Sequence, residues 1–408
     1  MECGCGSRYE ACMGRQLRVG VVGCGPAGLT VALLLGRRGH HVTLIERASN
    51  LCPVGAGLLL QPSGQLALRH LGLLDEVVAG AEPIEGLHAV THRGRTLVRL
   101  DYRRLGPDLI GYGVHRGDLF EILRRHAGRE GVGFELGRII VGSRETAGVI
   151  EAIDDSGQAW GPFDVLIGAD GARSRLRADP RLGASVRQFP LGAAWFSGRS
   201  DAVRGRLHQV TRGSRQLIGM LPVGKGRCSL FCALPRDGVA ALGNGGLDVL
   251  KREIVGLCPE AQSLVEQITG VGDLATAHYQ IVKLKRWSAA RLVCIGDAAH
   301  ATTPHLGQGV NLALLDAVAV GEALCEDGDI QAALARACAV RKKLTMWSWR
   351  LSNLLGPVFQ SEGWALAAAR DLALPILPHV PWLGRLMVGT MAGVRTGIWR
   401  GATLDMRS

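Results

Sequence analysis

The sequence predicts an α/β fold: a Rossmann-like domain on a parallel sheet, an inserted and mainly antiparallel β-sheet domain, and a C-terminal helical region. Three observations predict it. Apolar strands run into glycine-rich turns at three distant places, within residues 17–46, 163–177 and 291–317. The stretch 182–290 alternates short apolar runs with turn signals, which is typical of antiparallel strands. Beyond residue 321 the pattern is mainly helical.

These patterns divide the chain of 408 residues. The predicted Rossmann-like domain comprises residues 17–75, 107–180 and 285–335, the inserted sheet domain residues 76–106 and 181–284, and the helical region residues 336–408. Residues 1–16 lack the apolar core of a signal peptide, and we expect a disordered extension there.

Charge and cysteine content limit the classes of function. The net charge of +11 would attract anions, and nucleic acid is the first partner to consider. The arginines are scattered along the chain, however, so we predict no nucleic-acid binding. The 11 cysteines include no CxxC pair and no Cys/His spacing suited to zinc. We therefore expect no metal site and a reduced, cytoplasmic protein.

The first glycine-rich turn has the pattern Gly23-x-Gly25-x-x-Gly28. It follows an apolar strand, opens a helix predicted over residues 29–38, and is followed by Glu46 at the end of the next strand. That combination is the dinucleotide-binding fingerprint, in which the helix N-terminus faces a pyrophosphate. A glutamate at this position accepts a hydrogen bond from a ribose hydroxyl and disfavours a 2′-phosphate. NAD and the adenosine half of FAD both fit.

The two later turns distinguish between these cofactors. One reads Asp170-Gly171-Ala172-Arg173-Ser174, and the other runs from Gly296-Asp297-Ala298-Ala299-His300 through Pro304 and Gly307-Gln308-Gly309 to Asn311 and Asp316. In this order and spacing, the three turns resemble the fingerprints of the class A flavoprotein monooxygenases, the para-hydroxybenzoate hydroxylase-like family. The resemblance covers residues 17–67, 116–177 and 292–322.

The resemblance implies FAD as the cofactor. The residues that it places at the cofactor are Gly23, Gly25, Pro26, Ala27, Gly28, Glu46, Arg47, Arg116, Asp170, Gly296, Asp297, Pro304, Gly307, Gly309, Val310 and Asn311. The first turn and Glu46 would hold the ADP half, and Asp297 a hydroxyl of the ribityl or ribose. Arg116 would reach the pyrophosphate or ribityl side, and Asp170 would serve FAD and, indirectly, the nicotinamide. The helix that opens near Asn311 would stabilise the negative charge of reduced flavin.

The implied activity is hydroxylation of an aromatic or similarly electron-rich small molecule. In this family NADPH or NADH reduces FAD, O2 adds to form a flavin C4a-hydroperoxide, and its distal oxygen passes to the substrate. The sequence has no second GxGxxG turn, which agrees with transient nicotinamide binding. His305 and the adjacent Pro304, on the expected flavin side, are the candidate catalytic residues, with His305 as the base. His208, His278 and Tyr279 in the inserted domain are weaker candidates for the base. A purely structural histidine is the competing interpretation.

Three alternatives stay open. The apolar segment 364–394 would suit a quinone-pathway or other lipophilic-substrate hydroxylase or epoxidase at a membrane surface, although a packed helical layer is the favoured interpretation. A flavin-dependent halogenase needs an early lysine, whereas the first lysine here is Lys225. A non-enzymatic redox sensor would need a lost substrate site. The substrate, the choice between NADH and NADPH, and the oligomeric state are not specified.

Overall fold

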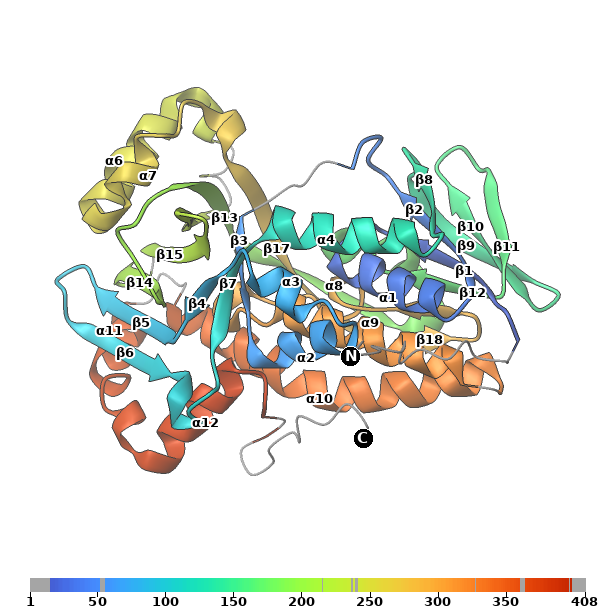
Figure 1. The fold of residues 1–408 in the computed structure, drawn as a ribbon. Coiled ribbons are helices and arrows are strands. Elements are labelled where there is room, and N and C mark those ends of the chain that lie inside the picture. The colour runs from blue at the N-terminus through green and yellow to red at the C-terminus, as the bar shows by residue number, and fades with distance from the viewer. Residues whose placement is uncertain are drawn as a thin grey trace, which may run out of the picture.

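The computed structural model describes residues 15–51, 56–214, 216–235, 238, 241–326, 328–359, 364–395 and 397. Two large sheets lie at two sides of the molecule (Figure 1). Helix α10 (Ile330–Phe359) runs along one edge of the molecule, and helix α9 (Gly309–Cys325) packs between α10 and α1 (Pro26–Arg37). This mixed α/β architecture, with an antiparallel sheet inserted into a Rossmann-like domain, confirms the predicted fold class.

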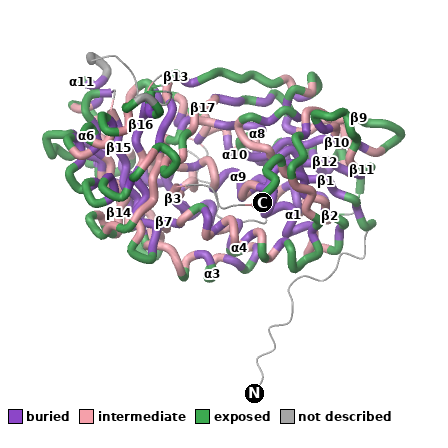
Figure 2. Tube along the Cα trace, turned by 90° about the horizontal axis from the view of Figure 1, so that it is seen from above, coloured by how far each residue is buried: buried purple, intermediate pink, exposed green. Residues whose placement is uncertain are grey.

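The first large sheet has six strands and is parallel except at one edge. In spatial order its strands are β18 (Ser288–Ala289), β19 (Leu292–Cys294), β12 (Val165–Gly168), β1 (Arg18–Val22), β2 (His41–Glu46) and β8 (Gly133–Leu136). Both faces are covered, so the central strands are continuous apolar runs rather than alternating ones. Figure 2 shows the buried residues gathered along β1, β12 and α9.

Helix α1 (Pro26–Arg37) connects β1 to β2. It begins three residues before the predicted start, because proline at the first helical position has the required φ and its missing N–H would be unpaired there anyway. It packs against α4 (Arg116–Arg129) and α9. Its buried side chains supply the centre of the largest hydrophobic core.

The second large sheet has seven strands taken from two distant stretches of the chain. In spatial order they are β17 (Ala275–Leu284), β13 (Ala184–Arg199), β16 (Arg227–Pro235), β15 (Gln216–Gly224), β14 (Arg206–Arg212), β5 (Gly86–Thr91) and β6 (Thr96–Asp101). All neighbours are antiparallel except β14 and β5. One face packs against α6 (Leu247–Leu257) and α7 (Gln262–Val265), and we call it the outer face.

Two small sheets complete the strands. The sheet β3 (Gly57–Leu60), β7 (Gly111–His115) and β4 (Glu82–Ile84) contacts β15 of the seven-stranded sheet. The sheet β9 (Ile140–Thr146), β10 (Val149–Asp154) and β11 (Ala159–Phe163) flanks the parallel sheet and was not predicted from the sequence. The short helices between strands are α2 (Pro62–His70), α3 (Leu74–Val78), α8 (Asp297–His300), η1 (Tyr102–Arg104), η2 (Gly171–Arg173), η3 (Leu176–Ala178), η4 (Pro180–Leu182), η5 (Leu242–Gly246), η6 (Pro259–Ala261), η7 (Val271–Asp273) and η8 (Pro304–Leu306).

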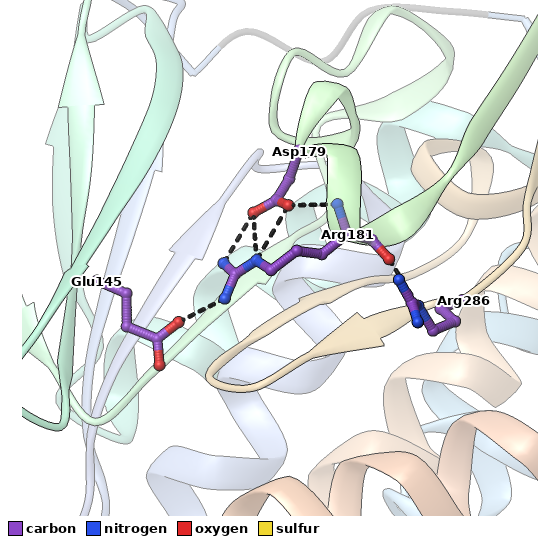
Figure 3. A network of polar contacts seen from close by, with 4 residues as sticks. All are labelled: Glu145, Asp179, Arg181 and Arg286. Carbon is purple, nitrogen blue, oxygen red and sulfur yellow. Dashed lines mark hydrogen bonds and ion pairs between the residues drawn. The ribbon is translucent and has the colours of Figure 1, made fainter.

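A polar network joins the two chain segments that connect the large sheets (Figure 3). Arg181, where the chain leaves toward β13, forms ion pairs with Asp179 and Glu145, both at 2.8 Å. Its carbonyl oxygen accepts a hydrogen bond at 2.6 Å from Nε of Arg286, which lies between β17 and β18 where the chain returns to the parallel sheet. The amide of Arg286 also donates to the carbonyl of Leu182 at 3.0 Å. These contacts join the departing and returning segments to each other and to β9.

The C-terminal helices are α10, α11 (Trp364–Ala373), η9 (Leu377–His379) and α12 (Pro381–Met391). The predicted domain limit at residue 336 falls inside α10, which is continuous from Ile330 and bridges the parallel sheet and η8. The other predicted domain limits stay predictions. Among the described residues, no helix combines the length and apolar character needed to cross a bilayer.

Most of the predicted N-terminal extension, residues 1–14, lies outside the described residues. Its last two residues are described, and both contact the Rossmann-like domain. Arg15 lies 3.5 Å from Asp164 in an ion pair, and the Gln16 side chain donates to the carbonyl of Gly39 at 2.6 Å.

Candidate cofactor and substrate site

The three glycine-rich turns meet at one edge of the parallel sheet. They follow β1, β12 and β19, which are neighbours and run in the same direction. The carboxyl ends of parallel strands form a shared crevice where α/β proteins bind ligands. Sequence segments separated by more than a hundred residues thus come together as predicted.

Two glycines of the first turn differ in the space that a Cβ atom would have. A Cβ atom built on Gly28 would lie 1.9 Å from the carbonyl oxygen of Gly23, so helix α1 can approach its own turn only with glycine there. A Cβ on Gly25 would meet no protein atom within 4 Å. Packing therefore explains Gly28 but leaves open space beside Gly25, where a ligand can approach the backbone closely.

Glu46 lies at the end of β2 and braces this turn. Its Oε2 accepts a hydrogen bond from the amide of Cys24 at 2.7 Å, and its Oε1 accepts one from Ala48 at 3.0 Å. Two backbone amides fix the half-buried carboxylate beside the turn, where a ribose is expected. The neighbouring Arg47 is exposed.

The second turn presents an aspartate with one unused oxygen. Asp170 accepts a hydrogen bond on Oδ2 from the amide of Arg175 at 3.1 Å. Its Oδ1 is shielded from solvent and has no hydrogen-bond partner among the described residues. Burial raises the pKa of this carboxyl group, and hydrogen bonds from Ser174 and from the amide of Arg175, together with the charge of Arg177, offset this effect only in part. A buried acceptor without a donor is expensive, so a ligand that donates to it would be favoured.

A buried ionic network centred on α9 holds the third turn in place. Asp316, on α9, accepts hydrogen bonds from the amide of Gly296 at 3.2 Å, from a ring nitrogen of His300 at 2.5 Å and from Nε of Arg341 at 2.8 Å. Burial alone would raise the pKa of Asp316, but His300 and Arg341 hold it below its usual value. Asp316 was part of the quoted motif, whereas Arg341, on α10, was not identified from the sequence.

Asp297 begins α8 and is exposed, whereas the three residues after it are buried. A Cβ built on Gly309, the first residue of α9, would lie 3.9 Å from Asp297 Oδ1. The carboxylate therefore stands beside the N-terminus of α9, accessible to a ligand that lies across both turns.

The start of α9 is joined to β3 by Asn311. Its Oδ1 accepts from the amide of Gln61 at 2.9 Å, and its Nδ2 donates to the carbonyls of Leu59 at 3.1 Å and Gly307 at 2.9 Å. The side chain is fully buried. Its polar atoms thus serve the protein, and only the backbone of Gly309, Val310 and Asn311 is left to face a cofactor.

His305, the candidate base, lies in η8 between Pro304 and the start of α9. Its ring stacks near the ring of Phe359 at a centroid distance of 6.1 Å and an interplanar angle of 30°. A Cβ on Gly356 would lie 3.9 Å from His305 Cε1 and 3.4 Å from the ring of Phe189. The histidine therefore contacts the end of α10, which in turn reaches the seven-stranded sheet. Pro304 is exposed in the same turn.

Arg116 is exposed at the first position of α4, and its amide donates to the carbonyl of Ala56 at 3.2 Å. This bond places the start of α4 against the segment that leads into β3. Among the described residues, no ion pair engages its guanidinium group, so the charge is available to an anion.

The seven-stranded sheet presents aromatic side chains on the face opposite α6 and α7, which we call the inner face. Ala194 and Cys232 pair in register and pack in the outer core, so their neighbours Trp195 and Phe231 point the other way. The Trp195 ring lies 5.7 Å from that of Phe231 and 6.2 Å, edge to face, from that of Tyr279. Phe189 extends this aromatic cluster, 6.5 Å from Tyr279.

Comparison with known proteins agrees with this arrangement. A family profile described as "FAD binding domain" matches residues 16–333. The chain belongs to the FAD binding domain family. It is an FAD-dependent monooxygenase of the para-hydroxybenzoate hydroxylase-like class A group, as the resemblance predicted.

Individual relatives span nearly the whole monooxygenase. The 6-methylpretetramide 4-monooxygenase of Streptomyces rimosus is 31% identical over 380 residues, 90% of each chain. The aurachin C monooxygenase/isomerase of Stigmatella aurantiaca is 31% identical over 80% of this chain and 85% of its own. The crystal structure of Klebsiella pneumoniae HpxO complexed with FAD and uric acid has a TM-score of 0.78 at 21% identity, covering 93% of this chain and 98% of that one. This structural likeness supports the fold.

The monooxygenase site fits the cofactor of its family. The open space beside Gly25, the unpaired Oδ1 of Asp170 and the accessible carboxylate of Asp297 lie in three turns that meet at one sheet edge. The assignment of individual residues to individual cofactor atoms stays a prediction. Of the aromatic cluster, only Tyr279 was considered from the sequence, as a weaker candidate base. The four members are scattered over three strands and become neighbours only through strand pairing.

Proposed function

We propose that this monooxygenase hydroxylates an aromatic or other electron-rich small molecule held against the inner face of the seven-stranded sheet. The observation that carries the proposal is the aromatic cluster of Phe189, Trp195, Phe231 and Tyr279, connected through Gly356 to His305. Aromatic rings prefer edge-to-face or offset contacts with other rings, and this cluster offers such surfaces beside the turn that opens α9.

Tyr279 supplies a polar contact for such a substrate. Its hydroxyl is shielded from solvent and has no hydrogen-bond partner among the described residues. Burial raises the pKa of the phenol well above its ordinary value, so the group keeps its proton and can donate. A substrate that carries a hydroxyl, carbonyl or ring nitrogen would satisfy this donor, and an apolar one would leave it unpaired.

The cofactor side would be held by the turns described above. When bound, FAD would take up hydride from NADPH or NADH and supply the O2 chemistry that places oxygen on the substrate. Asp297 would accept a hydrogen bond from a cofactor hydroxyl, and the exposed Arg116 would pair with an anionic group. The unpaired amides at the start of α9 carry partial positive charge, which stabilises an anionic ring. The partly buried aromatic face would help to exclude water from the reacting groups once a substrate covers it.

A substrate screen tests the proposal. NADPH and NADH oxidation by the FAD-loaded enzyme would be followed with phenols, aminobenzoates, hydroxypyridines and quinone precursors, with peroxide measured in parallel. A compound that accelerates NADPH or NADH oxidation without increasing the amount of peroxide formed is a coupled substrate. If every accelerating compound produces only peroxide, the inner-face assignment is wrong for that class.

A lipophilic substrate delivered at a membrane surface is the second candidate. In the C-terminal helical region, Leu354, Leu372, Ile376 and Trp382 expose between 59% and 68% of their surface. Elsewhere among the described residues, exposed large apolar side chains lie farther apart along the chain. A relative is named as an aurachin C monooxygenase/isomerase. Quinone-precursor turnover that rises when vesicles are added would favour this candidate.

A further inference from the structure

A second group of chemically reactive side chains lies on the outer face of the seven-stranded sheet. His208 is on β14, Cys258 ends α6, and Glu260 is in η6. One ligand atom from each residue lies within 4.8 Å of the other two. His208 pairs in register with Met220, which belongs to the core under α6 and α7. The group is therefore separated from the cofactor turns by the sheet.

An unpaired nitrogen of His208 points to a ligand in this group. Its Nε2 is shielded from solvent and has no hydrogen-bond partner among the described residues. An imidazole nitrogen that has no partner in the protein can bind a metal ion.

Cys258 and Glu260 supply donors of complementary kinds. Cys258 Sγ lies 3.4 Å from Glu260 Oε2 and 3.7 Å from Met220 Sδ. Metal binding would displace the thiol proton and turn Cys258 into a thiolate ligand.

The donor types match one class of ion. Imidazole nitrogen, thiolate sulfur and carboxylate oxygen are the ligands of tetrahedral zinc, with bonds that place neighbouring donors roughly 3.5 Å apart. The contact between Cys258 and Glu260 already has this separation. Glu260 is exposed, which leaves a path for the ion and for a water molecule as fourth ligand.

We propose that His208, Cys258 and Glu260 bind a zinc ion that fastens the turn after α6 to β14. The site is independent of the cofactor and of the proposed substrate. It would replace the expectation of no metal site. That expectation rested on spacing along the chain, and here the ligands come from separate elements.

Metal binding by the full-length, FAD-loaded protein tests this site. After dialysis against a chelator, Zn²⁺ would be added and the retained zinc counted per chain. Co²⁺ would be added to a second sample, because a tetrahedral thiolate site gives cobalt bands in the red, where oxidised flavin does not absorb. We expect one retained zinc and a red cobalt spectrum that Zn²⁺ abolishes.

Variants locate the ion. His208→Ala and Cys258→Ser should lose the bound zinc. Glu260→Gln, a change on an exposed side chain, should weaken zinc binding at least tenfold while the metal-free melting temperature is unchanged. Cys228→Ser removes another fully buried thiol of the same domain and should keep the site. Absence of retained zinc in the folded, yellow wild-type protein, or zinc binding that survives in Glu260→Gln and His208→Ala alike, would overturn the proposal.

Discussion

The carboxyl edge of the parallel sheet and the inner face of the antiparallel sheet, the two halves of the proposed site, are built by different means. At the edge, glycines let a ligand approach the backbone, and the carboxylates of Glu46, Asp170 and Asp316 accept hydrogen bonds from backbone amides. On the inner face, large aromatic side chains from different strands provide the surface. Backbone-built sites tolerate little sequence change, whereas side-chain faces can be altered without disturbing the scaffold. One half can therefore be shared across a family while the other sets the substrate.

The largest effect should follow from adding a methyl group to the first turn. Gly28→Ala would place Cβ 1.9 Å from the Gly23 carbonyl, so the turn or α1 must move. We expect loss of bound FAD together with a destabilised fold. Flavin absorbance and circular dichroism would measure both.

Gly25→Ala is the matched control, because its new methyl group would meet no protein atom. The melting temperature of the cofactor-free protein should stay near wild type while FAD affinity falls. Normal FAD affinity in this variant would show that the backbone at Gly25 is not approached by the cofactor.

The next largest effect should come from the network behind the third turn. Asp316→Asn leaves His300 and Arg341 without their carboxylate, and breaking a buried ion pair from one side costs about 3–5 kcal/mol of unfolding free energy. Denaturant unfolding would measure this loss, and FAD content should fall with it because the single amide oxygen of asparagine cannot accept from both Gly296 and Arg341.

The same network predicts a pH dependence. The pKa of Asp316 is lower in the folded protein than in the unfolded chain, so its stabilisation is complete above the ordinary aspartate pKa of about 4 and is lost as the pH falls further. Stability curves of wild type and Asp316→Asn should therefore converge at low pH. Parallel curves would mean that the carboxylate charge does not stabilise the fold.

A smaller effect is expected on the inner face. Tyr279→Phe removes one hydroxyl donor and keeps the ring, so FAD content and stability should change little. With a coupled substrate, kcat/KM should fall about tenfold, the equivalent of one hydrogen bond of about 1.4 kcal/mol. An unchanged kcat/KM with every coupled substrate would remove Tyr279 from the substrate site.

The smallest effect should be that of His305. The packing of its ring near Phe359 is compatible with a structural role, and its place beside α9 with a catalytic one. If it takes a proton from the substrate, His305→Ala should flatten the acidic limb of the kcat/KM profile against pH. A profile that keeps its shape at reduced amplitude would assign the residue to packing alone.

The sequence by itself determined the half of the site that is local. Each glycine-rich turn is a short run that joins one strand to the next helix, so its spacing is visible in the chain and predicted the dinucleotide turn, the Asp170 turn and the Gly296-Asp297 turn. The alternation of apolar and turn residues likewise predicted an antiparallel sheet between them.

Only the tertiary structure decided the rest. The aromatic cluster depends on the register of β13, β16 and β17, and Arg341 reaches Asp316 because α10 packs against α9. The group of His208, Cys258 and Glu260 forms where α6 ends over β14. Such contacts join residues with no fixed separation along the chain. The packing of whole helices and strands against one another determines these contacts. The spacing of residues along the chain therefore does not predict them.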